Sequence, residues 1–390
     1  MKKAFDTIAA RNRVANRILD TMHERDSFLV VGHKRPDEDC VASMVAFALL
    51  VNKFSKTVTI FLEDRVNENF EYLLRICTYN AISVVYTFPE RPVDTLVILD
   101  TAKPDLRMTD PGLDRLLSDH SVKVIEVDHH LGTDSEYQAP VELALVDRAT
   151  SAAELVGVLA YKLTRRTDLL EEHDIREIFS RNIVLAIVTG IIGDTKLGSF
   201  LQTSRERRMY RVWTEVFGVL LEQKTVDRSG NFSSIQQVFD ELERLSEDER
   251  KCYEEIWSKR TTSGKVAELL LPDATVAELT GKFGWDTMST VLRAVADKLA
   301  EESGCLSLVG FAGNQEHAHL YQFRARRSKS FTAVDLRDLI ERLGIKNGGG
   351  HQGAIGFRVE RSAISDIGAY FSSIVGTMNE MVADSGPGDS

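Results

Sequence analysis

Three short, largely apolar runs, each followed at once by acidic or histidine residues, constrain the fold of this chain more than any other feature. The runs are Phe28–Val31, Thr95–Leu99 and Val122–Val127. Strands that are apolar along their length are typical of parallel sheets covered on both faces. Because the carboxyl ends of parallel strands meet at one edge, the polar residues after the runs are expected to converge there. They are His33, Asp37, Asp39, Asp100, Asp128, His129 and His130.

Such a set of side chains predicts a metal site. Imidazole nitrogens and carboxylate oxygens suit a divalent ion such as Mn²⁺, Mg²⁺, Co²⁺ or Zn²⁺. Gathering so many charges is costly unless a cation is present or pKa values shift. Asp100 and Asp128 could instead cap following helices, but that coincidence would have to recur at each strand. A further carboxylate, Asp194, follows the apolar segment Asn182–Ile192, which is long enough for a buried helix or strand.

Segments with helical spacing alternate with these strands, so the N-terminal part is predicted to be an α/β domain with a parallel sheet and helices on both faces. The expected helices are Phe5–Met22, Ser43–Phe54, Phe70–Thr78, Leu113–Leu117, Ser151–Leu163 and Arg205–Leu221. Two more strands are expected at Val58–Leu62 and Ile82–Tyr86.

A second pattern begins near Gly264 and predicts a smaller α/β domain. Strands are expected at Val266–Leu271, Leu306–Phe311 and Ala318–Ala325, and helices at Thr287–Glu301 and Thr332–Leu343. Arg324 lies in a basic cluster, and the later run Gly348-Gly349-Gly350-His351 predicts a phosphate-holding loop. The predicted division is residues 1–228, a helical connector 229–260, residues 261–384 and a disordered tail 385–390.

Composition limits the class of protein. A length of 390 residues predicts two or three domains, and a net charge of −11 argues against a binder of long nucleic acid. Four scattered cysteines fit reduced thiols. We find no signal peptide and no apolar run long enough to span a bilayer, so we expect a cytoplasmic protein without membrane association.

Taken in order, the motifs resemble the DHH phosphoesterases that carry a C-terminal DHH-associated domain. The match involves His33, Asp37 and Asp39, then Asp100, the triplet Asp128-His129-His130, Asp194-Thr195, and finally Gly348–His351. Within the family, the chain is similar to the oligoribonuclease and bisphosphate-nucleotide phosphatase branch. Ala42, Lys196 and a longer stretch after Thr195 depart from the usual pattern and leave the shape of the pocket open.

The resemblance implies two metal ions, usually Mn²⁺. His33, Asp37 and Asp100 would hold one ion, and Asp39, Asp100, His129 and Asp194 the other, with Asp100 as the bridge. His130 would contact the scissile phosphate. Across a cleft, Arg324 and His351 with its glycines Gly348, Gly349 and Gly350 would hold the rest of the substrate.

These inferences predict a two-metal hydrolase of short oligoribonucleotides, dinucleotides or bisphosphate nucleotides, with His130 and Asp100 as catalytic residues. Alternatives are a cyclic-dinucleotide phosphodiesterase, a pyrophosphatase or polyphosphatase, and a non-catalytic nucleotide sensor. A processive exonuclease fits the acidic balance less well. The sequence leaves the metal and the oligomeric state open, a homodimer included.

Overall fold

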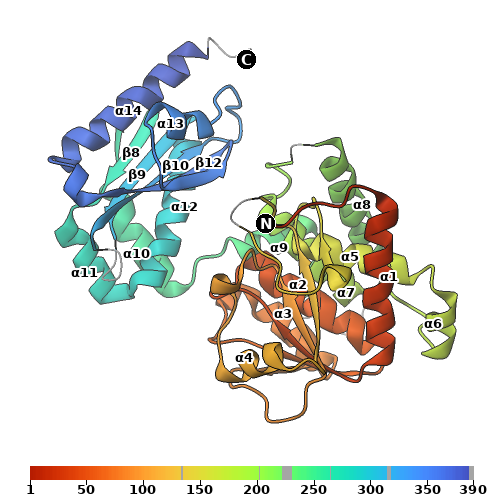
Figure 1. The fold of residues 1–390 in the computed structure, drawn as a ribbon. Coiled ribbons are helices and arrows are strands. Elements are labelled where there is room, and N and C mark those ends of the chain that lie inside the picture. The colour runs from red at the N-terminus through yellow and green to blue at the C-terminus, as the bar shows by residue number, and fades with distance from the viewer. Residues whose placement is uncertain (133–134, 202, 222–230, 264, 314–317, 386–390) are drawn as a thin grey trace. The chain divides into compact units, whose positions relative to one another are not determined.

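The chain forms two compact units, Met1–Arg244 and Leu245–Ser390. A computed structural model describes all residues except 133–134, 202, 222–230, 264, 314–317 and 386–390, which are grey in Figure 1. The predicted boundary after residue 228 and most of the predicted tail 385–390 lie outside the described residues. The predicted connector is divided, because α9 (Ile235–Leu242) belongs to the first unit and α10 (Glu247–Trp257) to the second.

The described part of the first unit contains a six-stranded, wholly parallel sheet in the order β3-β2-β1-β4-β5-β6. Every side chain of the central strand β4 is buried. Because successive side chains point to opposite faces, both faces of the sheet are covered, which confirms the predicted fold class. The strands are β1 Ser27–Val31, β2 Thr57–Phe61, β3 Ser83–Val85, β4 Thr95–Leu99, β5 Lys123–Asp128 and β6 Ala144–Val146. The short strand β6 was not predicted.

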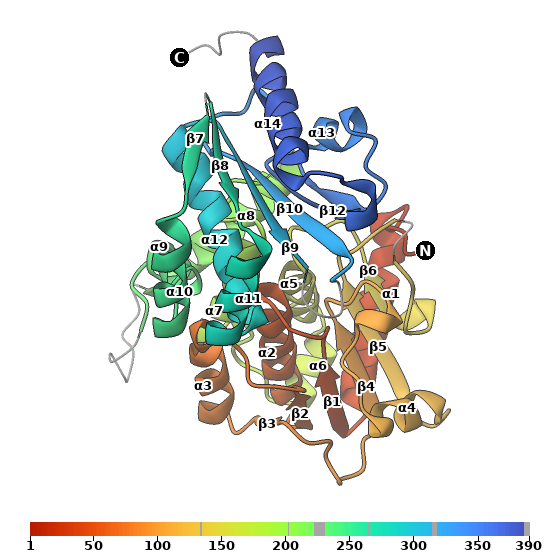
Figure 2. The ribbon, with the colours of Figure 1, turned by 90° about the vertical axis from the view of Figure 1, so that its left-hand side faces the viewer.

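The helices of the first unit surround this sheet (Figure 2), and α2, α5 and α7 pack against one another. The helix expected at Ser43–Phe54 begins earlier, at Glu38, because the side chain of Asp37 caps it by accepting the backbone N–H of Cys40. The helices are α1 Ile8–Glu24, α2 Glu38–Asn52, α3 Glu71–Tyr79, α4 Pro111–Ser118, α5 Ala152–Leu163, α6 Thr167–Glu172, α7 Arg181–Asp194 and α8 Ser204–Leu221. Short 3₁₀ turns occur at Glu68–Phe70, Pro104–Leu106 and Val141–Leu143.

The second unit has its own mixed sheet, in the order β11-β12-β10-β9-β8-β7 among the described residues. Only β8 and β9 are parallel in that sheet. One core gathers under α14 and another between the sheet and α10, α11 and α12. The elements are β7 Thr261–Ser263, β8 Val266–Leu270, α11 Asp273–Phe283, α12 Trp285–Ser303, β9 Leu306–Ala312, β10 Leu320–Arg327, α13 Arg337–Arg342, β11 Gly348–His351, β12 Ala354–Glu360, a 3₁₀ turn Arg361–Ala363 and α14 Ile367–Asp384.

Two predictions for this unit were wrong. The helix expected over Thr332–Leu343 is reduced to α13, because the guanidinium of Arg327 binds the carbonyls of Thr332 and Val334 and prevents those groups from entering a helix. The glycine run forms the strand β11 instead of a loop. At Gly350 (φ 142°) a Cβ would lie 2.2 Å from the carbonyl oxygen of Ala354, so only glycine allows this close pairing with β12.

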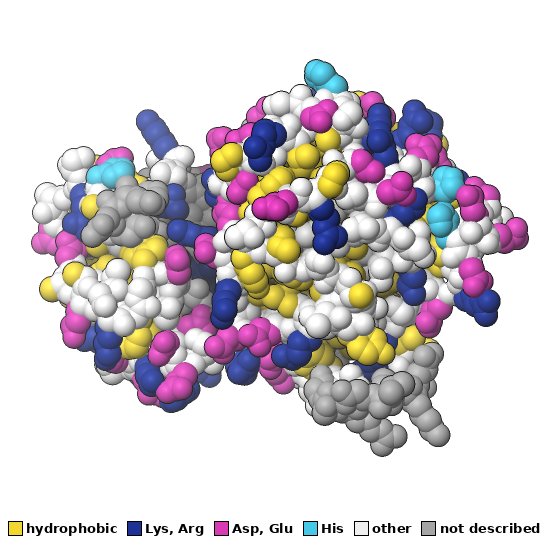
Figure 3. Space-filling model, turned by 90° about the horizontal axis from the view of Figure 1, so that it is seen from below, with side chains coloured by type: hydrophobic (Ala, Val, Ile, Leu, Met, Phe, Trp, Pro, Cys, Tyr) yellow, Lys and Arg dark blue, Asp and Glu magenta, His cyan; other side chains and the backbone are white. Residues whose placement is uncertain are grey.

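Charged side chains of both signs alternate over the face drawn in Figure 3, with apolar side chains between them. All four cysteines are buried free thiols. No helix among the described residues has the length and apolar character needed to cross a bilayer.

Candidate metal centre

The predicted ligands come from five separate elements of the first unit. His33 follows β1, Asp100 follows β4, and His129 follows β5, so all three stand at the carboxyl edge of the sheet. Asp39 lies in the first turn of α2, and Asp194 is the last residue of α7. Asp100 adopts the left-handed conformation (φ 49°), which is unusual for a residue with a side chain and typical of functional positions.

One half of the site is centred on His129. Its Nε2 lies 3.4 Å from Asp100 Oδ1, 3.4 Å from Asp194 Oδ2 and 3.9 Å from Asp39 Oδ2. The structure therefore brings four of the predicted ligands together, and Asp39, His129 and Asp194 form a group whose ligand atoms are close enough to hold one ion.

The other half is centred on His33. Its Nε2 lies 3.6 Å from Asp37 Oδ1 and 3.7 Å from Asp100 Oδ2. Asp100 thus turns one oxygen toward each histidine, which is the geometry expected of a bridging carboxylate. Cys40 also lies within reach of His33, but burial raises the pKa of this thiol to about 12, so it is neutral near pH 7.

The electrostatics of the site fit a cation. Burial raises the pKa of Asp39 well above its usual value, and the neighbouring carboxylates of Asp100 and Asp194 raise it further. Burial likewise raises the pKa of Asp194. The charges of Asp37 and Asp100 raise this pKa further, whereas the charge of His129 lowers it. Among the described residues, Asp100 Oδ1 has no hydrogen-bond partner although it is buried. Crowded, unsatisfied carboxylates of this kind are stabilised by divalent ions.

Asp39 is held in place by the start of α5. The backbone N–H of Ala152 donates to its Oδ2 at 2.6 Å, and that of Ala153 donates to Oδ1 at 3.0 Å. Ser151 caps the same helix. A helix N-terminus favours negative charge, so α5 both orients this carboxylate and offsets part of the cost of burying it.

Asp128, the first residue of the DHH triplet, has a different role from the ligands. No helix begins at residues 129–132, the described residues directly after it, so Asp128 does not cap one there. Its Oδ1 accepts the backbone N–H of His130 at 3.2 Å and lies 2.8 Å from His130 Nδ1. His130 Nδ1 also lies 3.6 Å from Asp100 Oδ1. His130 is half exposed, so Asp128 fixes its ring while the other edge of the ring remains accessible.

Two residues that the sequence analysis did not identify, Lys2 and Glu126, form a buried cluster of charges with Asp128. Lys2 is fully buried, and its Nζ lies 2.5 Å from Asp128 Oδ2, 2.6 Å from Glu126 Oε1 and 2.6 Å from the carbonyl oxygen of Thr101. Burial opposes ionisation of Asp128, but His130 and Lys2 together lower its pKa below the usual range. Glu126 could have been noticed as a charge between the apolar residues Ile125 and Val127 of β5; Lys2 gives no signal in the sequence.

Lys196, one of the departures from the family pattern, forms ion pairs that flank the site. Its Nζ lies 3.1 Å from Glu38 Oε1 and 3.0 Å from Glu243 Oε1. Lys196 and Leu197 both have positive φ and are followed by Gly198 with φ 82°, so the chain turns sharply here. Asp194 is the last residue of α7, directly before this turn. The two ion pairs of Lys196 link the turn to Glu38 at the start of α2 and to Glu243, the residue after α9.

In the second unit, Arg324 is partly buried and lies in one row with two glycines. It pairs with Gly356 of β12, which in turn pairs with Gly349 of β11, so the three residues share a face of the sheet. The guanidinium donates to the Ser289 carbonyl at 3.0 Å and to the Ser289 hydroxyl at 2.9 Å. Burial, and then the charges of Arg293 and Arg326, lower the pKa of Arg324 to about 9. No atom lies within 4 Å of the position that a Cβ of Gly349 would take. The backbone in the same row as Arg324 is therefore not covered by a side chain at this position.

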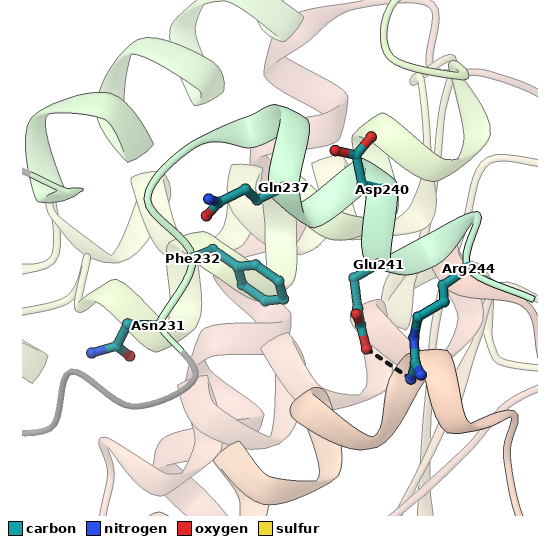
Figure 4. A pocket seen from close by; sticks show the side chains of 6 residues that line it. All are labelled: Asn231, Phe232, Gln237, Asp240, Glu241 and Arg244. Atoms are coloured by element: carbon teal, nitrogen blue, oxygen red, sulfur yellow. Dashed lines mark hydrogen bonds and ion pairs between the residues drawn. The ribbon is translucent and has the colours of Figure 1, made fainter. Parts of the chain in front are cut away.

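A surface pocket of the first unit takes no part in this constellation. It lies against α9 and is lined by Asn231, Phe232, Gln237, Asp240, Glu241 and Arg244 (Figure 4). Arg244 is paired with Glu241 at 3.1 Å, and none of the predicted ligands lines the pocket.

Comparison with known proteins agrees with this geometry. Residues 27–191 match the model of the DHH family, N-terminal domain. Residues 27–191 form a DHH domain. The matched segment contains all the predicted ligands except Asp194, and the family that the motifs indicated is confirmed.

Two curated relatives are cyclic-di-AMP phosphodiesterases. GdpP of Bacillus subtilis (strain 168) is 26% identical over 208 residues, which are 50% of this chain and 29% of GdpP. PdeA of Listeria monocytogenes serotype 1/2a (strain 10403S) is 25% identical over 200 residues, which are 48% of this chain and 28% of PdeA. The match with this chain therefore spans less than a third of the length of these relatives.

Among solved structures, an exopolyphosphatase-related protein from Bacteroides fragilis superposes with a TM-score of 0.60. It is 17% identical, and the match covers 94% of this chain and 95% of that protein. At this identity the likeness shows a shared fold, which extends over both α/β units.

Proposed function

We propose that this DHH-family chain is a two-metal-dependent phosphoesterase that hydrolyses short oligoribonucleotides, dinucleotides or bisphosphate nucleotides. The observation that carries the proposal is the position of Asp100, a buried carboxylate with one oxygen toward His33 and the other toward His129, close to the carboxylates of Asp37, Asp39 and Asp194. A purely structural ion-pair network would not leave Asp100 Oδ1 unsatisfied among three neighbouring acids.

The residues that would hold the ions form two overlapping sets. His33, Asp37 and Asp100 make the first set, and Asp39, Asp100, His129 and Asp194 make the second. Oxygen-rich ligands with one imidazole each suit Mn²⁺. The chemistry that such a pair of cations supplies is acidification of water and neutralisation of phosphoryl charge.

The protein's own groups would orient the substrate. Asp128 accepts from Nδ1 of His130, so Nε2 is the remaining ring nitrogen, and in the imidazolium form it would donate a hydrogen bond to a phosphoryl oxygen. In the second unit, Arg324 next to the bare backbone of Gly348, Gly349 and Gly350 would bind a second phosphate or a base edge. His351, the last residue of β11, would complete this subsite.

A second candidate is hydrolysis of cyclic dinucleotides, and it is favoured by the activity for which the relatives GdpP and PdeA are named, cyclic-di-AMP phosphodiesterase. One panel separates the candidates: a short RNA, adenosine 3′,5′-bisphosphate, a linear dinucleotide and a cyclic dinucleotide, each incubated with the full chain and Mn²⁺ and analysed by chromatography. Pyrophosphate in the same panel tests the pyrophosphatase alternative. A nucleotide that stays bound but intact for hours would contradict the enzymatic proposal and favour a sensor.

The decisive variant is Asp100→Ala. Removing the bridging carboxylate should lower the hydrolysis rate by at least about 10³-fold, which corresponds to the several kcal/mol that metal-ion catalysis supplies. The matched control is Asp105→Ala, which removes an exposed carboxylate just after β4. Circular dichroism should show that both variants stay folded, and near-normal turnover of Asp100→Ala would refute the assignment.

A further inference from the structure

Two histidines and a glutamate meet at a point of the first unit that the proposed catalysis does not use. His23 lies in the last turn of α1, Glu172 is the last residue of α6, and His173 is the C-cap of α6. His23 Nδ1 lies 3.0 Å from His173 Nε2 and 3.9 Å from Glu172 Oε1. One ligand atom from each residue fits within 4.8 Å of the others.

This cluster is separate from the catalytic centre. Helix α1 ends at Glu24, and β1 begins at Ser27, so His23 stands at the amino edge of the parallel sheet. The catalytic ligands stand at the carboxyl edge, one strand length away, which is roughly 15 Å for five residues.

Packing fixes the positions of the two imidazole rings. The ring of Phe54 meets the ring of His173 edge-on with centroids 5.0 Å apart, and the two imidazoles are also edge-on, at 5.3 Å. Helix α1 is fixed beneath His23 by the buried side chains of Leu19 and Met22. Burial, and then the charge of His23, lower the pKa of His173, which favours the neutral ring that a metal needs. Its Nε2 faces His23 Nδ1, and a bound ion would replace this contact.

We propose that His23, Glu172 and His173 form a second metal site, which binds one zinc-type transition-metal ion. At Zn–N distances of about 2.0–2.1 Å, two tetrahedral ligand nitrogens lie about 3.3 Å apart; the observed 3.0 Å needs little adjustment. Glu172 is more than half exposed, so its carboxylate can rotate to close the remaining gap. Two imidazoles and one carboxylate suit Zn²⁺, Cu²⁺ or Ni²⁺, whereas Mg²⁺ and Ca²⁺ prefer sites made of oxygen.

Such an ion would join α1 to α6, which are separated by about 150 residues of chain. Binding to the folded state alone stabilises that state by mass action. The site would therefore act as a structural link at the edge of the sheet opposite the catalytic centre, with its fourth position open to water.

The test is equilibrium dialysis of the full chain against Zn²⁺ alone, followed by metal analysis. The catalytic ligands also bind zinc in such an assay, so the comparison is between the wild-type chain, His173→Gln, Glu172→Gln and the control His120→Gln, which changes an exposed histidine elsewhere in the first unit. We expect His173→Gln to bind one equivalent fewer than wild type and His120→Gln to bind the same number. Glu172→Gln should weaken that one equivalent by about tenfold or more, since the loss of even an outer partner costs about 10–100-fold.

A second set of measurements tests whether a loss of zinc binding is due to misfolding of the variant. His173→Gln should keep its circular dichroism spectrum and its Mn²⁺-dependent hydrolysis, and it should lose part of the zinc-induced rise in unfolding temperature. Equal zinc stoichiometry in wild type and His173→Gln would overturn the proposal. So would an equal zinc-induced rise in the two proteins.

Discussion

Lys2 is an ammonium group buried beneath the candidate centre, between the carboxylates of Glu126 and Asp128. The backbone of Lys2 is also fixed, since its N–H donates to Ser135 Oγ at 3.1 Å and its carbonyl accepts the N–H of Gly132 at 3.3 Å. A buried charge that loses its partner is far more costly than one that keeps it. Lys2 is therefore expected to support both the fold and the orientation of His130.

Lys2→Met should lower the free energy of unfolding by about 3–5 kcal/mol, because it leaves two buried carboxylates without a cation. Urea denaturation measures the change. The control is Lys3→Met, because Lys3 is exposed and makes its contact with Tyr137 through the backbone. Equal urea midpoints for the two variants would contradict the role assigned to Lys2.

Metal binding should release protons. Burial would lower the pKa of His129, but Asp100 and Asp194 outweigh burial and raise it well above the usual value. The pKa values of Asp39 and Asp194 are raised as well, so the metal-free site holds protons near pH 7 that a bound cation displaces. Affinity for Mn²⁺ should therefore rise with pH and fall on acidification.

Calorimetric titration with Mn²⁺ in two buffers of different ionisation enthalpy measures this proton release. The observed binding enthalpy should differ between the buffers in proportion to the protons released, and the apparent affinity should increase between about pH 6 and pH 8. Asp39→Asn serves as the comparison, because it removes one of the groups whose pKa is raised. Identical enthalpies in both buffers would show that no proton leaves.

At the scale of elements, the close crossing of α7, α2 and α5 forms the wall of the site. Gly190 of α7 lies where a Cβ would come within 2.4 Å of Asp39 Oδ1 and 2.6 Å of the Cβ of Ala153. The absent side chain lets α7 approach close enough for Asp194, one turn further on, to reach His129. Close packing against Asp39 and Ala153 therefore explains why position 190, inside a helix, is glycine.

Gly190→Ala should destabilise the fold by about 1–3 kcal/mol, as overpacking does, and should also weaken Mn²⁺ binding because Asp39 must move. Gly218→Ala in α8 is the matched control, since nothing lies within 4 Å of its Cβ position. That change should be neutral or stabilising by up to about 1 kcal/mol. Thermal unfolding with and without Mn²⁺ distinguishes the two, and equal behaviour would argue against the packing explanation.

At the scale of the whole molecule, the chain has separate hydrophobic cores in its two units. All of the proposed metal ligands belong to Met1–Arg244, whereas Arg324 and the glycine strand belong to Leu245–Ser390. Loss of metal should therefore affect the stability of one unit alone.

Calorimetry of the full chain should show that chelation of Mn²⁺ shifts only the unfolding transition of the first unit. At a metal concentration 100-fold above the Kd, the lost stabilisation is about 2.7 kcal/mol, or roughly 5–10 °C for a unit of this size. The Asp39→Asn chain should lose this response. A shift of both transitions by the same amount would contradict the assignment of all ligands to one unit.

The sequence by itself determined the parallel sheet and the segments that carry the proposed ligands. Apolar runs ending in Asp100 or in Asp128-His129-His130 fix where strands stop, and parallel strands must stop at one edge. The positions of His33, Asp39 and Asp194 follow from the same local signals. The hydrophobic periodicity and the order of the motifs along the chain were enough for these conclusions. The ends of strands and the residues that follow them depend on positions that are neighbours in the sequence.

Only the tertiary structure decided which side chains actually meet. Lys2 reaches Asp128 across 126 positions of sequence, and His23 reaches His173 across 150. Asp128 turns toward Lys2 and His130, and the glycine run pairs with β12 as a strand because a hairpin brings the two together. Such contacts depend on how helices and strands pack in space, and local periodicity carries no record of that packing.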